Sequence, residues 1–328
     1  MAPGPGLGGH TTDMAHAHSH AHDHSHQHPA DPVDPYVVDW EESAPRLAVA
    51  AGADAPWYAS VAATLVTPAD RITADIGCGG AGMAAALAGA MTEGRVLAVD
   101  GDSAVLEAAQ ERLAPGAYER SASSRAEVSI EFVLDDLDGD LPAVRAATGD
   151  RGADVAWASA SVHHAGDQQQ AVDILASLLA PGGRLALAEG GLPMRCLPWD
   201  VGVGEPGLEL RLDAAQDIWF ARMRRQLPGS VPMPYGWPNA LRRAGLTDVR
   251  TKTWLFEAPT PLVPADRQRV AREFEHRVER LRETGLLADD DVAAWARLLD
   301  ESDPAWLGHR DDLQRLTARS VHIGHRTD

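Results

Sequence analysis

The segment TADIGCGGAG, residues 73–82, decides the fold that we expect for this chain. It continues a short apolar run, Ile72–Ile76, that predicts a buried strand, and the helix-forming run MAAALA follows it. Glycines permit sharp turns and leave no Cβ between the backbone and a ligand. A strand, a glycine turn and a helix in succession are typical of the nucleotide site of α/β proteins. Asp75 is then expected at the carboxyl end of its strand, where such proteins bind their ligands.

Length and composition restrict the class of protein. The chain has 328 residues, of which 45% are hydrophobic, so it can bury a sizeable core. Its formal net charge of −19 repels phosphate groups, and we expect neither a nucleic acid nor an anionic membrane surface as a partner. No apolar run reaches about 18 residues and no signal-peptide pattern is visible, which predicts no membrane span. The two cysteines, Cys78 and Cys196, predict no disulfide framework and are consistent with a cytoplasmic protein.

Residues 1–35 are rich in Gly, Pro, His, Ala and Asp and have no apolar periodicity, so we expect a disordered tail. Eight of the 14 histidines of the chain fall between His10 and His28. This composition fits either a biased, solvated tail or a weak site for divalent zinc, nickel or copper. It predicts no catalytic metal, because a catalytic site needs a fixed geometry. The rest of the chain, residues 36–328, is expected to form one domain.

Further strands follow the glycine loop in a regular order. Apolar runs predict them at residues 94–100, 127–134, 153–159 and 184–189. Polar side chains follow the first three of these strands: Asp100 with Gly101, then the acidic turn DDLDGDLP at 135–142, then ASVHH at 160–164. An amphipathic helix is expected over 167–180, where the Pro-Gly-Gly of residues 181–183 should end it.

Taken together, these segments resemble the class I S-adenosylmethionine (SAM) methyltransferases. The loop resembles the D-x-G-x-G-x-G motif of that family, except that Ala81 stands at the third glycine and Gly82 follows it. The WAS…HH and LAPGGRL strings resemble two further family segments. The resemblance covers residues 70–190, and the bias of the chain toward Ala, Arg, Gly and Pro suggests an actinobacterial-type member. It implies an α/β fold: a seven-stranded Rossmann-like methyltransferase sheet with helices on both faces.

The resemblance also implies roles for individual residues in binding SAM. Gly77, Gly79 and Gly82 would admit the methionine end, next to Cys78 and Ser159, and Asp75 would order the loop and the amino group. Asp100, beside Gly101, would accept hydrogen bonds from the ribose hydroxyls. An NAD enzyme would carry a similar acid, and a helix N-cap is a further alternative for Asp100. Asp136 would bind the adenine amino group and the N–H of Leu137 a ring nitrogen, with Asp135 as the competing choice for Asp136.

The histidine pair after the fourth strand has two interpretations. An imidazole titrates near neutral pH, so His163 is a candidate general base and His164 a candidate substrate contact. The alternative is that both rings only shape the wall of the pocket. The resemblance implies that this strand end lies beside the methionine part of SAM.

Beyond residue 190 the resemblance weakens. Residues 191–310 are expected to form a lid on the substrate side and a helical insertion, with helices after the fifth strand and between the sixth and seventh strands. A helix over 207–227 carries several arginines, which could hold an anionic substrate or form a solvated face. Arg195, Trp219 and Arg222 are our candidate substrate contacts. The insertion could cover the substrate or form a homodimer contact.

The function implied is SAM-dependent methyl transfer to an oxygen or nitrogen atom of a small molecule or natural product. One alternative is the methylation of a carboxylate or a peptide during natural-product maturation. Two others are an NAD-dependent oxidoreductase and a non-catalytic metal-handling protein, which the histidine-rich tail suggests. No N-P-P-Y string follows the fourth strand, and this lowers the case for methylation of DNA or glutamine.

Overall fold

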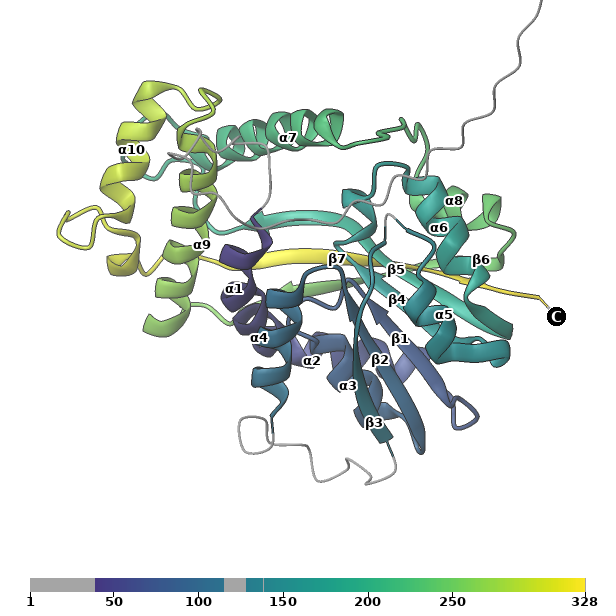
Figure 1. Cartoon of the computed structure of the whole chain (residues 1–328). Coiled ribbons are helices and arrows are strands. Elements are labelled where there is room, and N and C mark those ends of the chain that lie inside the picture. Colours follow the sequence, from purple (N-terminus) through teal and green to yellow (C-terminus); the bar gives the residue numbers. More distant parts are fainter. Residues whose placement is uncertain (1–38, 115–127, 138, 328) are drawn as a thin grey trace, which may run out of the picture. The chain divides into compact units, whose positions relative to one another are not determined.

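The computed structural model describes residues 39–114, 128–137 and 139–327 (Figure 1). These residues belong to one compact unit, Pro35–Asp328. Residues 1–35, for which we expected a disordered tail that is either simply solvated or a weak metal site, lie outside the described residues. In the described part, no helix combines the length and the apolar character that crossing a bilayer requires.

A seven-stranded mixed sheet forms the centre of this unit, as predicted. In spatial order the strands are β3 (Val128–Leu134), β2 (Gly94–Asp100), β1 (Ile72–Ile76), β4 (Ala153–Ser159), β5 (Leu179–Arg195), β7 (Leu316–His325) and β6 (Thr247–Glu257). β1 to β5 are parallel to one another, whereas β7 runs antiparallel to both β5 and β6. The register pairs Asp75 on β1 with Ala98 on β2, and Asp100 on β2 with Leu134 on β3.

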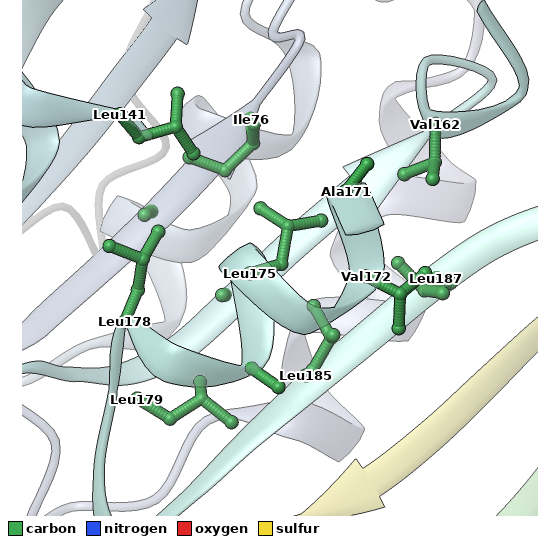
Figure 2. Close-up of a cluster of buried hydrophobic side chains, with 14 of the residues drawn as sticks. Ile76, Leu141, Val162, Ala171, Val172, Leu175, Leu178, Leu179, Leu185 and Leu187 are labelled. Carbon is green, nitrogen blue, oxygen red and sulfur yellow. The ribbon is translucent and has the colours of Figure 1, made fainter. Parts of the chain in front are cut away.

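Helices cover both faces of the sheet because successive side chains of each strand point to opposite faces. Along β4, Ala156 and Ala158 belong to one buried cluster, and Val155 and Trp157 to the other. The first cluster packs under α5 (Pro142–Thr148), α6 (Gln168–Ser177) and α8 (Trp237–Arg243); Figure 2 shows the α6 side chains facing those of β5. The second packs under α2 (Ala55–Leu65), α3 (Gly82–Ala90) and α4 (Ser103–Leu113).

A third hydrophobic cluster lies entirely in the C-terminal half of the chain. It contains buried side chains of α7 (Leu208–Gln226), α9 (Pro264–Arg282) and α10 (Asp289–Leu299), including Phe274 and Trp295. These three helices group near one end of β5 and β7 (Figure 1). Helical insertions were predicted after the fifth strand and between the sixth and seventh strands. These two insertions therefore form a common core of their own.

The predicted boundaries of one helix and of the strand after it were wrong. The helix expected over 167–180 ends at Ser177. The strand expected over 184–189 is β5, which begins at Leu179, paired with Ala153, and ends at Arg195. The Pro-Gly-Gly segment forms an irregularity inside β5 instead of ending the helix: Gly182 has φ +71°, and a Cβ on Gly183 would lie 2.8 Å from the carbonyl oxygen of Ala153. The remaining elements are α1 (Trp40–Ala53) and three short 3₁₀ helices, η1 (Gly149–Arg151), η2 (Val162–His164) and η3 (Leu307–His309).

Candidate active site

A cavity of about 870 Å³ opens at the carboxyl ends of the parallel strands. Its size is that of a pocket for a small molecule or cofactor. The glycine loop, the ends of β1, β2, β4 and β5, and the turn after β3 line it from the sheet side. Residues of α1, α2 and the end of α7 line it from the helical side, together with Arg319 of β7.

The glycine loop between β1 and α3 is shaped by close approaches. Gly77 and Gly79 have φ of +65° and +50°, and a Cβ on Gly77 would lie 2.5 Å from the Cβ of Ser161. Both line the cavity, as does Cys78 between them. Ala81, at the third glycine of the family motif, also takes a left-handed conformation, with φ +53°. For a residue with a Cβ, this conformation costs about 1–2 kcal/mol. The loop keeps the left-handed conformation at this position although alanine stands in place of the motif's glycine.

Gly82 has a different place from the one we predicted. It is the first residue of α3 and is not among the residues that line the cavity. A Cβ there would lie 2.5 Å from the Tyr58 ring, so this position needs a glycine for the packing of α2 on α3. The letter pattern alone could not separate a glycine that faces a ligand from one that faces a helix.

Asp75 connects the strand to the helix that follows the loop. Only 2% of its surface is exposed, and its Oδ2 accepts a hydrogen bond of 2.8 Å from the backbone N–H of Ala84. Burial raises the pKa of this carboxyl to about 8. Asp75 also lines the cavity, so a cation bound there would stabilise its ionised form.

Asp100 holds the glycine loop from the neighbouring strand. Its Oδ2 accepts a hydrogen bond of 2.9 Å from the N–H of Gly79, and burial raises the pKa of the carboxyl. The N-cap of α4 is Asp102, whose Oδ1 accepts from the N–H groups of Ala104 and Val105. The N-cap alternative for Asp100 is therefore wrong, and Asp100 lines the cavity beside Gly101.

In the turn after β3, the two candidates for adenine binding, Asp135 and Asp136, have different surroundings. Asp135 accepts hydrogen bonds of 2.8 and 3.0 Å from the N–H groups of Ala143 and Val144, at the start of α5. Its carboxylate thus stabilises that helix end. Asp136 and Leu137 line the cavity near Gly101. This arrangement favours Asp136 over Asp135 as the ligand contact.

The 3₁₀ helix η2, which follows β4 and the lining residue Ser159, carries an imidazole held by a carboxylate. The Nδ1 of His163 lies 2.8 Å from Oε2 of Glu189, at the cavity end of β5. Glu189 is 3% exposed, and its Oε1 accepts from the N–H groups of Ser161 and Val162 at 3.1 and 3.0 Å. Both carboxylate oxygens thus hold the segment that carries His163. The Nε2 atom is the ring nitrogen that this arrangement leaves for a proton from a ligand.

His164 differs from its neighbour. Its ring meets the edge of Trp40 at 5.1 Å and lies 4.2 Å from the ring of His163. Burial, together with the charges of His163, Arg224 and Arg280, lowers the pKa of His164 to about 3. A ring that stays neutral near pH 7 is a poor base, so His164 lines the cavity as an uncharged side chain and His163 is left as the candidate base.

The predicted substrate contacts of the lid are not at the cavity. Arg195 forms an ion pair with Asp213 of α7, and Trp219 is buried in the third hydrophobic cluster. Arg222 is not among the lining residues. The side chains of α7 that do line the cavity are Met223 and Gln226.

Residues 39–66 were expected, from the resemblance, to cover the pocket, or else to pack on the sheet, and Trp40, Leu47, Trp57 and Tyr58 of this segment line the cavity. The lining residues that sequence reasoning missed include three charged ones, Asp54, Glu189 and Arg319. No motif distinguishes these three positions from ordinary strand and helix residues.

Acidic side chains outnumber cationic ones in the lining of the cavity. Arg319 is its one permanently cationic lining residue within the described part of the chain. Such a lining favours a cationic ligand and disfavours a pyrophosphate. The described residues contain no group of three His, Cys, Asp or Glu side chains that could hold a metal ion. The acidic lining residues are Asp54, Asp75, Asp100, Asp102, Asp135, Asp136 and Glu189.

Comparisons with known proteins agree with this geometry. Residues 74–185, which include the glycine loop and the histidine pair, match a family model described as a methyltransferase domain. A comparison with curated protein sequences finds no match.

Solved structures resemble the chain at low sequence identity. The BH2331 protein of Bacillus halodurans is 15% identical, with a TM-score of 0.46 over 84% of this chain and 100% of that one. The YcgJ protein of Bacillus subtilis is 17% identical, with a TM-score of 0.44 over 83% and 98%. An arsenic(III) S-adenosylmethionine methyltransferase of Chlamydomonas reinhardtii is 16% identical, with a TM-score of 0.40 over 79% and 65%.

Proposed function

We propose that this chain, a SAM-dependent methyltransferase, transfers the methyl group to a hydroxyl of a small molecule or natural product. The observation that carries the proposal is the convergence of three carboxylates on one cavity. Asp75 of β1, Asp100 of β2 and Asp136 after β3 line it together with the glycine loop. These are the positions that the family resemblance associates with the amino group, the ribose and the adenine of SAM.

The charge of the cavity supports SAM over a nicotinamide dinucleotide. SAM carries a sulfonium cation, whereas NADH carries a pyrophosphate that needs hydrogen-bond donors and cations. Seven carboxylic side chains line the cavity, against the single guanidinium of Arg319. An oxidoreductase that uses NADH is therefore the weaker candidate.

A hydroxyl acceptor is favoured by the base that the site offers. A hydroxyl is a poor nucleophile until its proton is removed, and His163, oriented by Glu189, lines the cavity where this could occur. A carboxylate acceptor needs no base and would be repelled by the acidic lining. A nitrogen acceptor remains the second candidate, because the same imidazole can deprotonate an ammonium group.

The reaction requires alignment more than activation, because the sulfonium is already an activated methyl donor. The acceptor oxygen would attack the methyl carbon as the carbon–sulfur bond breaks, and its proton would pass to Nε2 of His163. The products are a methyl ether and the neutral thioether S-adenosylhomocysteine (SAH). The cavity would hold the two reactants in line and exclude water.

Calorimetric titration with SAM and with NADH tests the choice of cofactor. We expect SAM to bind and NADH not to bind. Replacing Asp100 by Ala should weaken SAM binding by roughly 10- to 100-fold, because charged hydrogen bonds contribute about 1.5–3 kcal/mol. Asp167→Asn is the matched control, since Asp167 caps α6 outside the cavity. Unchanged SAM affinity in Asp100→Ala, with the fold intact by circular dichroism, would remove the ribose assignment.

A panel of acceptors tests the proposed chemistry. Phenols, aliphatic alcohols, amines and carboxylic acids are incubated with SAM, and the release of SAH is measured. With an accepted hydroxyl compound, we expect His163→Ala to lower kcat by about 10²- to 10⁴-fold. SAM affinity should stay within about twofold, since a base acts on the acceptor. Equal kcat values for the variant and the wild-type enzyme would leave His163 as a wall residue.

Three earlier expectations stay part of this proposal. A cytoplasmic location is supported by two free, buried cysteines, Cys78 and Cys196. Burial raises the pKa of both thiols, which favours the unreactive protonated form. A homodimer and weak metal binding by the histidine-rich segment also remain proposals.

A further inference from the structure

An ion pair between distant segments lies at one side of the cavity. Oδ2 of Asp54, between α1 and α2, is 2.7 Å from Nη1 of Arg319, on β7. Both residues line the cavity, and both side chains are partly exposed, Asp54 by 21% and Arg319 by 32%. A ligand in the cavity can therefore reach both charges.

The surroundings of the pair fix its position. The guanidinium carbon of Arg319 lies 4.5 Å from the centre of the Trp57 ring and 5.5 Å from that of Phe256. These aromatic contacts keep the arginine in place without occupying all its donors. Burial, together with the charges of Asp54 and Asp75, raises the pKa of the nearby Tyr58, whose hydroxyl thus remains protonated. Tyr58 also lines the cavity.

The shape of SAM matches the distribution of these groups. A sulfonium sulfur carries three carbon substituents, which diverge from it. If the adenosyl group lies at Asp100 and Asp136, and the methyl group faces His163, the lining residues grouped around Tyr58 are available for the third substituent. They are Asp54, Asp75 and Arg319, whose charges all act on the Tyr58 hydroxyl.

We propose that Asp54 and Arg319 bind the amino-acid end of the cofactor, with Arg319 on its carboxylate and Asp54 joining Asp75 at its ammonium group. This inference rests on the proposed function. A zwitterion fits an existing ion pair because each protein charge gains a partner of opposite sign, so no buried charge is left unpaired. Guanidinium and carboxylate also match in geometry and can form two parallel hydrogen bonds.

The assignment gives the C-terminal half of the chain a part in cofactor binding. Arg319 follows the α9–α10 insertion in sequence and reaches the cavity because β7 pairs with β5, where Gly191 opposes Arg319. The methyltransferase-domain match ends at residue 185, so it does not contain this arginine. Truncation of the chain to the matched segment would remove it.

Two ligands that differ only at the amino-acid end test the proposal. SAH carries the amino acid, whereas 5′-methylthioadenosine has a methyl group in its place. In calorimetry we expect Arg319→Leu to weaken SAH binding by roughly 10- to 100-fold, as for the loss of a charged hydrogen bond, and to leave 5′-methylthioadenosine binding within about twofold. Arg319→Lys should retain part of the SAH affinity. Arg297→Leu, at an exposed ion pair with Asp303, is the matched control.

Each outcome of this test decides a separate point. Failure of the wild-type enzyme to bind either ligand would overturn the proposed function itself. Equal weakening of both ligands by Arg319→Leu would make the arginine a structural residue and overturn the inference, as would unchanged SAH binding. Asp54→Asn supplies a second variant that does not depend on how Arg319→Leu folds, and it should also lower SAH affinity selectively.

Discussion

At the scale of single residues, Asp75 shows that ionisation of an acid in the site is unfavourable in the ligand-free protein. Its carboxyl is buried, it has one backbone donor, Ala84, and its pKa is raised to about 8. The ordinary value for an aspartate is 3.8. Between these two values the unfolded chain has lost the proton and the folded chain has kept it, so the stability of the ligand-free protein falls as pH rises.

Replacing Asp75 by Asn should remove this dependence. An asparagine can still accept the hydrogen bond from Ala84 but does not ionise. Relative to the wild-type protein, the variant should have a similar Tm near pH 4 and a Tm roughly 4–8 °C higher near pH 8. Scanning calorimetry of the ligand-free proteins between these pH values measures the difference. A constant difference in Tm would mean that Asp75 ionises normally in the folded state.

The acids of the site could be predicted from the sequence, but their partners could not. Asp75, Asp100 and Asp136 all line the cavity. What sequence spacing left open was which of two neighbouring acids caps a helix, and the structure gives that role to Asp102 and Asp135. Glu189 was missed because its role depends on His163, which lies 26 residues earlier, in η2 after the neighbouring strand β4.

At the scale of elements, α7 was predicted within one residue at each end, yet the wrong side chains were expected at the cavity. Periodicity indicates which face of a helix is apolar, but not which neighbour that face meets. The apolar face carries Trp219 into the third hydrophobic cluster. Only the last turns, at Met223 and Gln226, reach the cavity.

Arginines of the same helix illustrate a related limit. They suggested an anionic substrate, but Arg211 forms a two-point ion pair with Asp291 of α10. Arg224 donates to the carbonyl oxygens of His163 and Gly166, at 2.9 and 3.2 Å. It thereby connects the end of α7 to the segment that carries the candidate base. Such contacts between segments about 60 or more residues apart leave no local pattern in the sequence.

At the scale of the whole molecule, the seven-stranded sheet could be predicted through the family resemblance, because helices alternate with the first five strands and recognisable turns follow them. The insertions were predicted as helices, but their common core was not. It depends on non-local contacts such as Phe274 with Trp295, whose rings lie 4.8 Å apart. The same non-local pairing brings Arg319 beside Asp54.

The net charge of −19 and the acidic cavity act together on the cofactor. SAM has a net charge of +1 near neutral pH and SAH has none, so the field of the protein should favour SAM before the reaction more than SAH after it. Raising NaCl from about 0.1 M to about 1 M shortens the Debye length from about 10 Å to about 3 Å. Over this range we expect SAM affinity to fall by about three- to tenfold and SAH affinity by less than about twofold.

Calorimetric titration of both ligands at several salt concentrations measures the two slopes. Potassium glutamate in place of NaCl serves as a control for chloride binding at the cavity. Because the two ligands share the adenosine and the amino acid, salt effects on those parts cancel in the ratio of their affinities. Parallel slopes would mean that the carboxylates near the sulfonium are protonated or already neutralised. A steeper slope for SAM would instead indicate that the charge of the whole protein contributes to its preference for SAM over SAH.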